Sequence, residues 1–312
     1  MAREQLRDFR ILPALSIKSG ATAGKLTKRI ITGAVLIPIV VVLVYWGPAW
    51  LVTSIAAVVA LLAMKEFFDL CARMGLRAAR TWTMICAVVL FGLQWLQGSV
   101  EVHWLSGNTE LIRGLPWRYA SIEALFLAFV FGMAAIGVMS RMPLVDVLPS
   151  IGASAAGLLF IAFPFSFLAR MEGKARTGPV LVLFALAIVW AGDTVAYFVG
   201  KSIGRIKMAP TLSPGKTWEG AAGNVIGSLI VGYCFALWQH GPIGAWLITA
   251  ALANVAGQVG DLVESSYKRG AGAKDSGALL PGHGGMLDRI DSLIFAAPVV
   301  WLAAGWLLQA RL

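Results

Sequence analysis

The sequence predicts an all-α, polytopic integral membrane protein, a helical bundle of about nine transmembrane helices. Hydrophobic residues make up 58% of the 312 residues and charged residues 13%, and the mean hydropathy is +0.78. A typical soluble domain has about 45–50% apolar and about 25% charged residues. Stretches free of Asp, Glu, Lys and Arg also recur along the chain, most of them close to the roughly 20 residues that cross a bilayer. These observations exclude a soluble globule, a disordered chain and a disulfide-stabilised scaffold.

The first five predicted spans lie between residues 30 and 170. Residues 30–64 are uncharged over 35 residues and are interrupted at Trp46-Gly47-Pro48, which predicts two helices joined by a tight turn. Uncharged segments predict the third, fourth and fifth spans at residues 81–100, 124–140 and 147–169. If one of these early spans is absent, the total falls to eight.

Four more spans follow. The sixth covers residues 179–200 and contains Asp193. Residues 220–260 are uncharged over 41 residues and are interrupted at Gln239-His240-Gly241-Pro242, which predicts the seventh and eighth spans. Residues 292–310 predict the ninth.

The distribution of basic residues predicts the orientation of the spans. With a cytoplasmic N-terminus, 20 of the 26 Lys and Arg residues lie on the cytoplasmic side, although residues 170–176 place three on the other side. Cytoplasmic loops collect Lys and Arg, so we predict that the N-terminus is inside. The chain then has three parts: a basic cytoplasmic segment at residues 1–29, N-terminal transmembrane helices at 30–170, and a transmembrane region with loops at the cytoplasmic face at 179–312.

Asp193 is the first candidate functional residue. It lies eight residues before Lys201, hence roughly 12 Å inside the end of its helix. An acid at that depth costs several kcal/mol unless it is paired, hydrated or bound to a cation. The alternative is an Asp used in helix packing, satisfied by Thr194, Tyr197 or a neighbouring Lys.

Residues 213–219 form a second candidate site. Gly215-Lys216-Thr217 resembles the end of a Walker A loop, but position 210 is Pro where that motif needs Gly, and no strand is predicted before it. We therefore reject a P-loop. What remains is a turn that places the hydroxyls of Ser213 and Thr217, the Lys216 ammonium and backbone N–H groups before a helix N-terminus, which suits an anion. A solvated cytoplasmic turn is the alternative.

Four acids in residues 261–291 form two pairs. Asp261 and Glu264 end the eighth span, Asp288 and Asp291 precede the ninth, and the members of each pair are three residues apart. Residues at this spacing share one side of a helix, where like charges repel unless a cation lies between them. Carboxylates with room for water and phosphate oxygens suit Mg²⁺. The pairs therefore indicate a magnesium site at the membrane surface.

The basic residues between these pairs indicate a phosphate substrate. Lys268, Arg269 and Lys274 would neutralise phosphate oxygens, so the segment points to metal-assisted chemistry on a phosphate. A charge-rich loop that follows the positive-inside rule is the alternative, and it explains the basic residues but not the paired acids. His283 fits a phosphate ligand, a proton carrier or a turn residue, and chemistry alone does not separate these.

Three motifs in residues 190–292 carry a family resemblance. The first two are Trp190-x-x-Asp193-Thr194-x-Ala196-Tyr197-x-x-Gly200-Lys201 and Ser213-Pro214-x-Lys216-Thr217-Trp218-Glu219-Gly220. The third is Ser265-x-x-Lys268-Arg269-x-x-x-x-Lys274-Asp275-x-Gly277-x-x-x-Pro281-Gly282-His283-Gly284-Gly285-x-x-Asp288-Arg289-x-Asp291. Together they resemble the signature of the phosphatidate cytidylyltransferase family, also called CDP-diacylglycerol synthases. The family commonly has two lysines after Ser-Pro, whereas here the first is Gly215, and the first 140 residues carry no matching motif.

The resemblance implies the reaction CTP + phosphatidate → CDP-diacylglycerol + pyrophosphate in phospholipid synthesis, dependent on Mg²⁺ and compatible with a second cation. The catalytic residues that it implies are Lys268, Arg269, Lys274, Asp288 and Asp261. The implied substrate-binding residues are Ser213, Lys216, Thr217, His283, Arg289 and Asp193. The implied metal ligands are Asp261, Asp288 and Asp291. The implied partners are CTP, phosphatidate and membrane lipid, without nucleic acid, and the implied assembly is a homodimer in the bacterial cytoplasmic (inner) membrane.

Two other functions fit parts of this pattern. A cation-coupled transporter would use Asp193 and the paired acids as an ion pathway, but transporters favour acids near the membrane midplane and often contain a repeat. Here the acids cluster at one face and no repeat is apparent. Another CTP-dependent lipid enzyme, such as a lipid kinase, would share Mg²⁺ and the basic loop but lack the long third motif.

Overall fold

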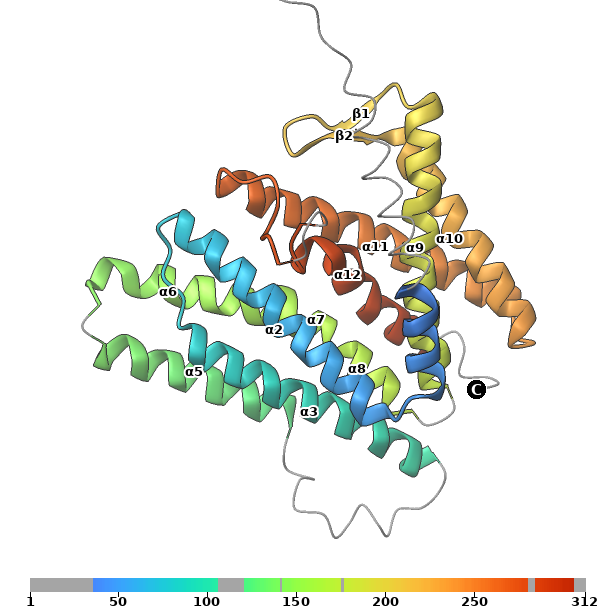
Figure 1. Cartoon of the computed structure of the whole chain (residues 1–312). Helices are drawn as coiled ribbons and strands as arrows, with labels where there is room; N and C mark the ends of the chain where they lie inside the picture. The colour runs from blue at the N-terminus through green and yellow to red at the C-terminus, as the bar shows by residue number, and fades with distance from the viewer. Residues whose placement is uncertain (1–35, 106–120, 141, 175–176, 280–283, 306–312) are drawn as a thin grey trace, which may run out of the picture. The chain divides into compact units, whose positions relative to one another are not determined.

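The computed structural model describes residues 36–105, 121–140, 142–174, 177–279 and 284–305 (Figure 1). The chain divides into two units, residues 1–39 and residues 40–312. The predicted basic segment at residues 1–29 lies outside the described residues. The helices and strands given below lie in the second unit, apart from residues 36–39 at the start of the first helix.

Helices account for most of the described residues. The N-terminal helices are a short apolar helix at Leu36–Trp46, then α2 (Ala49–Arg73), α3 (Arg80–Leu105) and α5 (Ile122–Met139). A continuous run follows, with α6 (Leu144–Gly157), the π-helical turn η2 (Leu158–Ala162), α7 (Phe163–Phe165) and α8 (Phe167–Glu172). The C-terminal elements are α9 (Gly178–Ile203), strands β1 (Lys207–Ala209) and β2 (Ser213–Thr217), α10 (Trp218–Trp238), α11 (Ile243–Gly270) and α12 (Leu287–Ala303).

The predicted fold class is confirmed, and the predicted spans correspond to these helices. Within the described ranges, seven helices are long and apolar enough to cross a membrane. The predicted break after the first span is confirmed at Gly47 and Pro48, since one helix ends at Trp46 and α2 begins at Ala49. The first and ninth predicted spans correspond to the two shorter helices, Leu36–Trp46 and α12.

Several helices extend beyond the apolar stretches that predicted them. Helix α2 continues past residue 64 to Arg73, α11 continues past residue 260 to Gly270, and α12 begins at Leu287 rather than at residue 292. Polar side chains in these extensions have partners inside the protein, such as Lys268 with Glu264 one helical turn away. The acids of both predicted pairs therefore lie within helices, where a spacing of three does place them on one side.

The segment after α9 is a β-hairpin, and the expectation of a turn at residues 213–219 is wrong. Strands β1 and β2 pair antiparallel, with Lys207 opposite Thr217 and Ala209 opposite Ser213. A strand thus precedes the Gly-Lys-Thr sequence, contrary to the prediction. The rejection of a P-loop still stands on spacing, because Pro occupies position 210. Pro and Gly are rare in strands, which explains why this strand could not be predicted.

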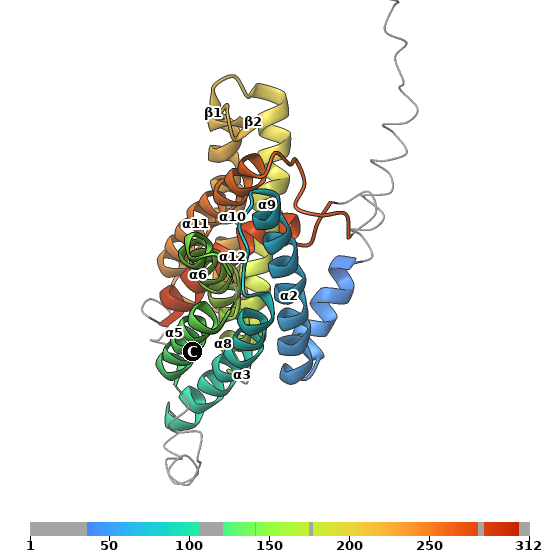
Figure 2. The same ribbon diagram turned by 90° about the vertical axis from the view of Figure 1, so that its left-hand side faces the viewer.

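Helices α9 to α12 pack on one another and carry the candidate site. Helix α10 runs beside α9, and α12 runs beside α11 (Figures 1 and 2). The approach of α11 to α12 depends on Gly260, where a Cβ atom would lie 2.6 Å from the backbone oxygen of Asp291. Small residues allow helices in a membrane to approach this closely. Gly260 therefore brings Asp291 against α11 next to Asp261.

An apolar core joins the N-terminal helices to this group. Helix α8 contacts α2, α3, α9 and α12, so it links the two halves of the unit. The core is built from large, fully buried side chains that include Met64, Phe68, Leu90, Phe91, Met171 and Phe184. This packing fixes α2 relative to the site helices.

The hairpin and the end of α11, which the distribution of basic residues predicts on the same side of the membrane, contact each other. Lys216 pairs with Asp261, and the Arg269 side chain donates to the Leu212 carbonyl oxygen.

We expect a single cysteine at Ala278, an exposed position in the loop after α11, to react with an impermeant thiol reagent only after the cell membrane is permeabilised. Cys71 and Cys86 are buried and Cys234 is exposed, and all three are replaced by Ala in this experiment. Labelling of intact cells from outside would contradict the predicted orientation.

Candidate functional site

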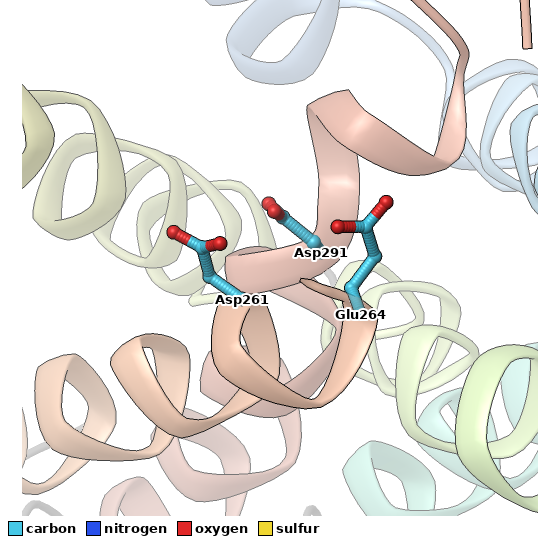
Figure 3. A group of neighbouring side chains, drawn as sticks. All are labelled: Asp261, Glu264 and Asp291. Carbon is cyan, nitrogen blue, oxygen red and sulfur yellow. The ribbon is translucent and has the colours of Figure 1, made fainter. Parts of the chain in front are cut away.

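Three carboxylates converge between α11 and α12. One oxygen each of Asp261, Glu264 and Asp291 lies within 4.8 Å of the others. Figure 3 shows the three side chains turned toward a common space, two from α11 and one from α12. Asp261 and Glu264 meet because they are three residues apart on one helix, and Asp291 joins them because Gly260 allows the close crossing.

The donor atoms of this cluster fit a hard divalent cation. All three groups offer oxygen, the ligand type that Mg²⁺ prefers. The Glu264 side chain is only 4% exposed, and its Oε1 atom accepts no hydrogen bond from any described residue. Carboxylates this close repel one another unless positive charge lies between them. The spacing in the sequence indicated Glu264 as a paired acid, but the family resemblance did not imply it as a metal ligand.

Lys268 supplies part of that positive charge. Its Nζ atom lies 2.5 Å from Glu264 Oε2 and 2.6 Å from Asp288 Oδ1. The side chains of Lys268 and Asp288 are 12% and 11% exposed, so the ion pair is largely shielded from solvent. The structure thus directs Asp288 toward Lys268 and groups Glu264, rather than Asp288, with Asp261 and Asp291.

The second oxygen of Asp288 holds the loop that precedes α12. Asp288 Oδ2 accepts hydrogen bonds from the backbone N–H groups of Ser276 at 3.0 Å and of Gly285 at 2.8 Å, and it lies 3.0 Å from the Ser276 hydroxyl oxygen. Asp288 lies in the first turn of α12, where a negative charge is favoured by the helix dipole. One carboxylate therefore orients Lys268 and fixes both ends of the loop.

The hairpin brings a second lysine to the carboxylate cluster. Lys216, on β2, places its Nζ atom 2.5 Å from Asp261 Oδ2. Arg269 holds the hairpin on the end of α11, because its Nε atom donates to the Leu212 carbonyl oxygen at 3.0 Å and its Nη1 atom to the Ala273 carbonyl oxygen at 3.2 Å. The family resemblance implied Arg269 as a catalytic residue, and in the structure its side chain is directed to backbone carbonyl groups.

A cavity of about 260 Å³ adjoins the cluster between α9, α10, α11 and β2. Its polar lining comes from Asp193, Tyr197, Lys216, Thr217, Asn224, Gln258, Asp261 and Ser292. Thr217 also caps α10, since its hydroxyl accepts the Gly220 N–H at 3.1 Å. The cavity thus shares Asp261 with the carboxylate cluster and is also lined by Lys216, the hairpin lysine that contacts Asp261.

Asp193, which lines this cavity, belongs to a polar network that joins α9, α10 and α11. Its Oδ1 atom accepts from Asn224 Nδ2 at 3.1 Å, and Asn254 Nδ2 donates to the Asn224 side-chain oxygen. Gln258 Nε2 in turn donates to Asn254 Oδ1 at 2.7 Å. The partner of Asp193 is therefore an amide of α10 and not Thr194, whose hydroxyl donates to a backbone carbonyl. Asn224 and Gln258 were not predicted, because a lone amide in an apolar helix has no sequence signature.

The remaining predicted residues lie outside this convergence. Ser213 begins β2 and pairs with Ala209 in the hairpin. Lys274 is exposed in the loop after α11, and Arg289 is exposed on α12. His283 lies outside the described residues.

Comparison with known proteins places these observations in a family. Residues 27–306 match the model described as "Cytidylyltransferase family". A phosphatidate cytidylyltransferase of Synechocystis is 33% identical over 289 residues, which cover 88% of this chain and 95% of that protein. Those of Brucella abortus and Bacillus subtilis are 43% and 42% identical over 48% and 46% of this chain. These two alignments span about half of the relatives' own length, 56% and 54%.

Proposed function

The chain belongs to the cytidylyltransferase family, and on this premise we propose that it transfers the cytidylyl group of CTP to phosphatidate, giving CDP-diacylglycerol and pyrophosphate. The observation that carries the proposal is the convergence of three carboxylates with Lys216 and Lys268 beside a polar cavity. This combination of fixed negative and positive groups suits a cation and two phosphate-bearing substrates.

Asp261, Glu264 and Asp291 would hold Mg²⁺ in this proposal. When bound, Mg²⁺ supplies charge neutralisation for the phosphate oxygens of the nucleotide and of the leaving pyrophosphate. Asp288 takes a supporting role, because its carboxylate is directed to Lys268 and to the loop before α12.

The reaction needs positioning more than proton transfer. The phosphate of phosphatidate is already anionic near neutral pH, so its oxygen can attack the α-phosphorus of CTP without a strong general base. One P–O bond forms at the α-phosphorus, and the bond from that phosphorus to the oxygen bridging the α- and β-phosphates breaks. The protein must hold two polyanions in line and neutralise their charge, as in other phosphoryl-type transfers.

Lys216 and Lys268 fit that task from two different elements of the fold. Lys216 comes from β2 and contacts Asp261, whereas Lys268 comes from the last turn of α11 and contacts Glu264. Both ammonium groups are held by carboxylates in the protein, so each is oriented before a substrate arrives. Arg269 would act on the same reaction indirectly, by fixing the hairpin that carries Lys216.

The proposed location of the reaction is the cytoplasmic face of a bacterial inner membrane. The site residues come from the ends of α9, α11, α12 and the hairpin, which are the segments rich in basic residues. CTP would enter from the aqueous side, and phosphatidate would enter from the surrounding lipid.

Pyrophosphate release from the purified protein tests the proposal. We expect release from CTP, with Mg²⁺ present, only when phosphatidate is added, and a lipid product that contains cytidine. Parallel reactions with dCTP and ATP define the nucleotide requirement. A lipid product that gains only a terminal phosphate, with release of a nucleoside diphosphate, would indicate a lipid kinase. Absence of any phosphatidate-dependent pyrophosphate release would contradict the proposed function.

A further inference from the structure

Glu66, near the C-terminal end of α2, contacts the segment that begins α12. Its Oε1 atom accepts the Met286 N–H at 3.0 Å. Its Oε2 atom accepts the Leu287 N–H at 2.9 Å and the Ser276 hydroxyl at 2.8 Å. Glu66 is 8% exposed, and these partners lie 210 to 221 residues later in the chain. A buried acid from the N-terminal half of the chain thus contacts the start of α12 and the loop before it.

These hydrogen bonds replace a cap that α12 lacks locally. The first N–H groups of a helix have no partner within the helix, and a side-chain oxygen at the N-cap position usually accepts from one of them. The N-cap residue of α12 is Met286, which offers no such oxygen. Glu66 accepts from the first two N–H groups of this turn, and its negative charge is favoured at a helix N-terminus.

Ser276 connects Glu66 to the carboxylate cluster. Its hydroxyl contacts Glu66 Oε2 and Asp288 Oδ2, and Asp288 Oδ1 contacts Lys268, which in turn contacts Glu264. Hydrogen-bonded ionic networks of this kind orient their members together when they are shielded from water. A change at Glu66 is therefore transmitted to groups that border the proposed cation site.

Two glycines allow the backbone to pass over the Glu66 carboxylate. A Cβ atom at Gly277 or at Gly285 would collide with a carboxylate oxygen of Glu66. The collision at Gly285 would also involve the Ser276 hydroxyl. These positions are glycine in the long motif, and this contact gives a physical reason for them.

We propose that Glu66 is a positioning residue for the catalytic site: it caps α12 from α2 and so sets where Asp288 and Asp291 lie against α11. Glu66 is a member neither of the carboxylate cluster nor of the cavity lining, and its hydrogen bonds lead to the start of α12 and to Ser276. The proposal rests on the proposed function for its activity readout, but its structural part is independent of the reaction.

Glu66→Gln tests the proposal against a matched acid on the same helix. Asp69→Asn is the control, because Asp69 pairs with Arg80 at 2.5 Å and its side chain is 44% exposed. In Glu66→Gln we expect faster hydrogen exchange in a peptide covering residues 284–292. We also expect the Mn²⁺ affinity, measured by electron paramagnetic resonance, to fall roughly 10–100-fold, as for other residues that orient metal ligands, and kcat to fall by a similar factor. Asp69→Asn is expected to change neither the hydrogen exchange, nor the Mn²⁺ affinity, nor kcat.

Ser276→Ala provides a second, milder test, which serves if Glu66→Gln does not fold. It removes the bridge to Asp288 but leaves the bonds from Glu66 to Met286 and Leu287. We expect a smaller fall in Mn²⁺ affinity. Where both variants fold, we expect a double variant whose loss is less than the product of the two single losses, because both act on one network.

The outcomes separate this proposal from the proposed function. Unchanged hydrogen exchange and unchanged Mn²⁺ affinity in Glu66→Gln would overturn the positioning role, even if the wild-type protein makes CDP-diacylglycerol. If Glu66→Gln does not fold, unchanged Mn²⁺ affinity in Ser276→Ala would overturn it. Faster exchange and weaker Mn²⁺ binding in a protein that makes no CDP-diacylglycerol would support the positioning role and overturn the proposed function alone.

Discussion

Asp291→Asn is expected to lower kcat/KM for CTP and phosphatidate by roughly 10³-fold or more. The substitution removes one of the three carboxylates that would hold Mg²⁺. A bound metal ion contributes several kcal/mol of charge stabilisation in the transition state, and each 1.4 kcal/mol corresponds to a tenfold change in rate. The protein should still fold, because Asn has nearly the shape of Asp and the substitution relieves repulsion between neighbouring acids.

The measurement is cytidylyl transfer by purified protein in detergent, at several Mg²⁺ concentrations. Asp146→Asn is the control, because Asp146 lies in the first turn of α6 and is not a member of the carboxylate cluster. It is expected to retain wild-type activity. An Asp291→Asn protein with near wild-type kcat/KM would contradict the assignment of Asp291 as a metal ligand.

Lys268→Met is expected to lower both activity and stability. Lys268 lies between Glu264 and Asp288, and all three side chains are at most 12% exposed. Removing one partner of a buried ion pair leaves an uncompensated charge and typically costs about 3–5 kcal/mol. We therefore expect a lower thermal unfolding midpoint, together with loss of cytidylyl transfer, since the Lys268 ammonium would also contact substrate phosphate.

Lys65→Met is the matched control, because Lys65 is exposed on α2 and the same atoms are changed. It should leave the unfolding midpoint and the activity close to wild type. A Lys268→Met protein that unfolds at the wild-type temperature would contradict the view that this lysine neutralises the two buried acids.

Features that depend on neighbouring residues were predictable from the sequence. The long uncharged stretches predicted the helices, and Gly47-Pro48 predicted the first break, because both signals are local. The spacing of three between Asp261 and Glu264 placed them on one side of a helix, as the structure confirms. The motifs also predicted the family correctly.

Features that depend on contacts between distant segments were not predictable. Spacing alone paired Asp288 with Asp291, whereas the crossing of α11 and α12 groups Glu264 with Asp261 and Asp291. The helices were predicted too short at their polar ends, because partners such as Glu66 at the start of α12 come from another part of the chain. The hairpin was also missed, since its strands contain Pro and Gly.

The fate of the α-phosphate of CTP tests the central claim most directly. Wild-type protein is incubated with phosphatidate and CTP labelled either at the α- or at the γ-phosphate, and the lipid fraction is extracted. We predict that the α-label enters the lipid, that the γ-label leaves as pyrophosphate, and that Asp291→Asn transfers neither. Transfer of the γ-label to lipid, or no label in lipid from the wild-type protein, would contradict the account.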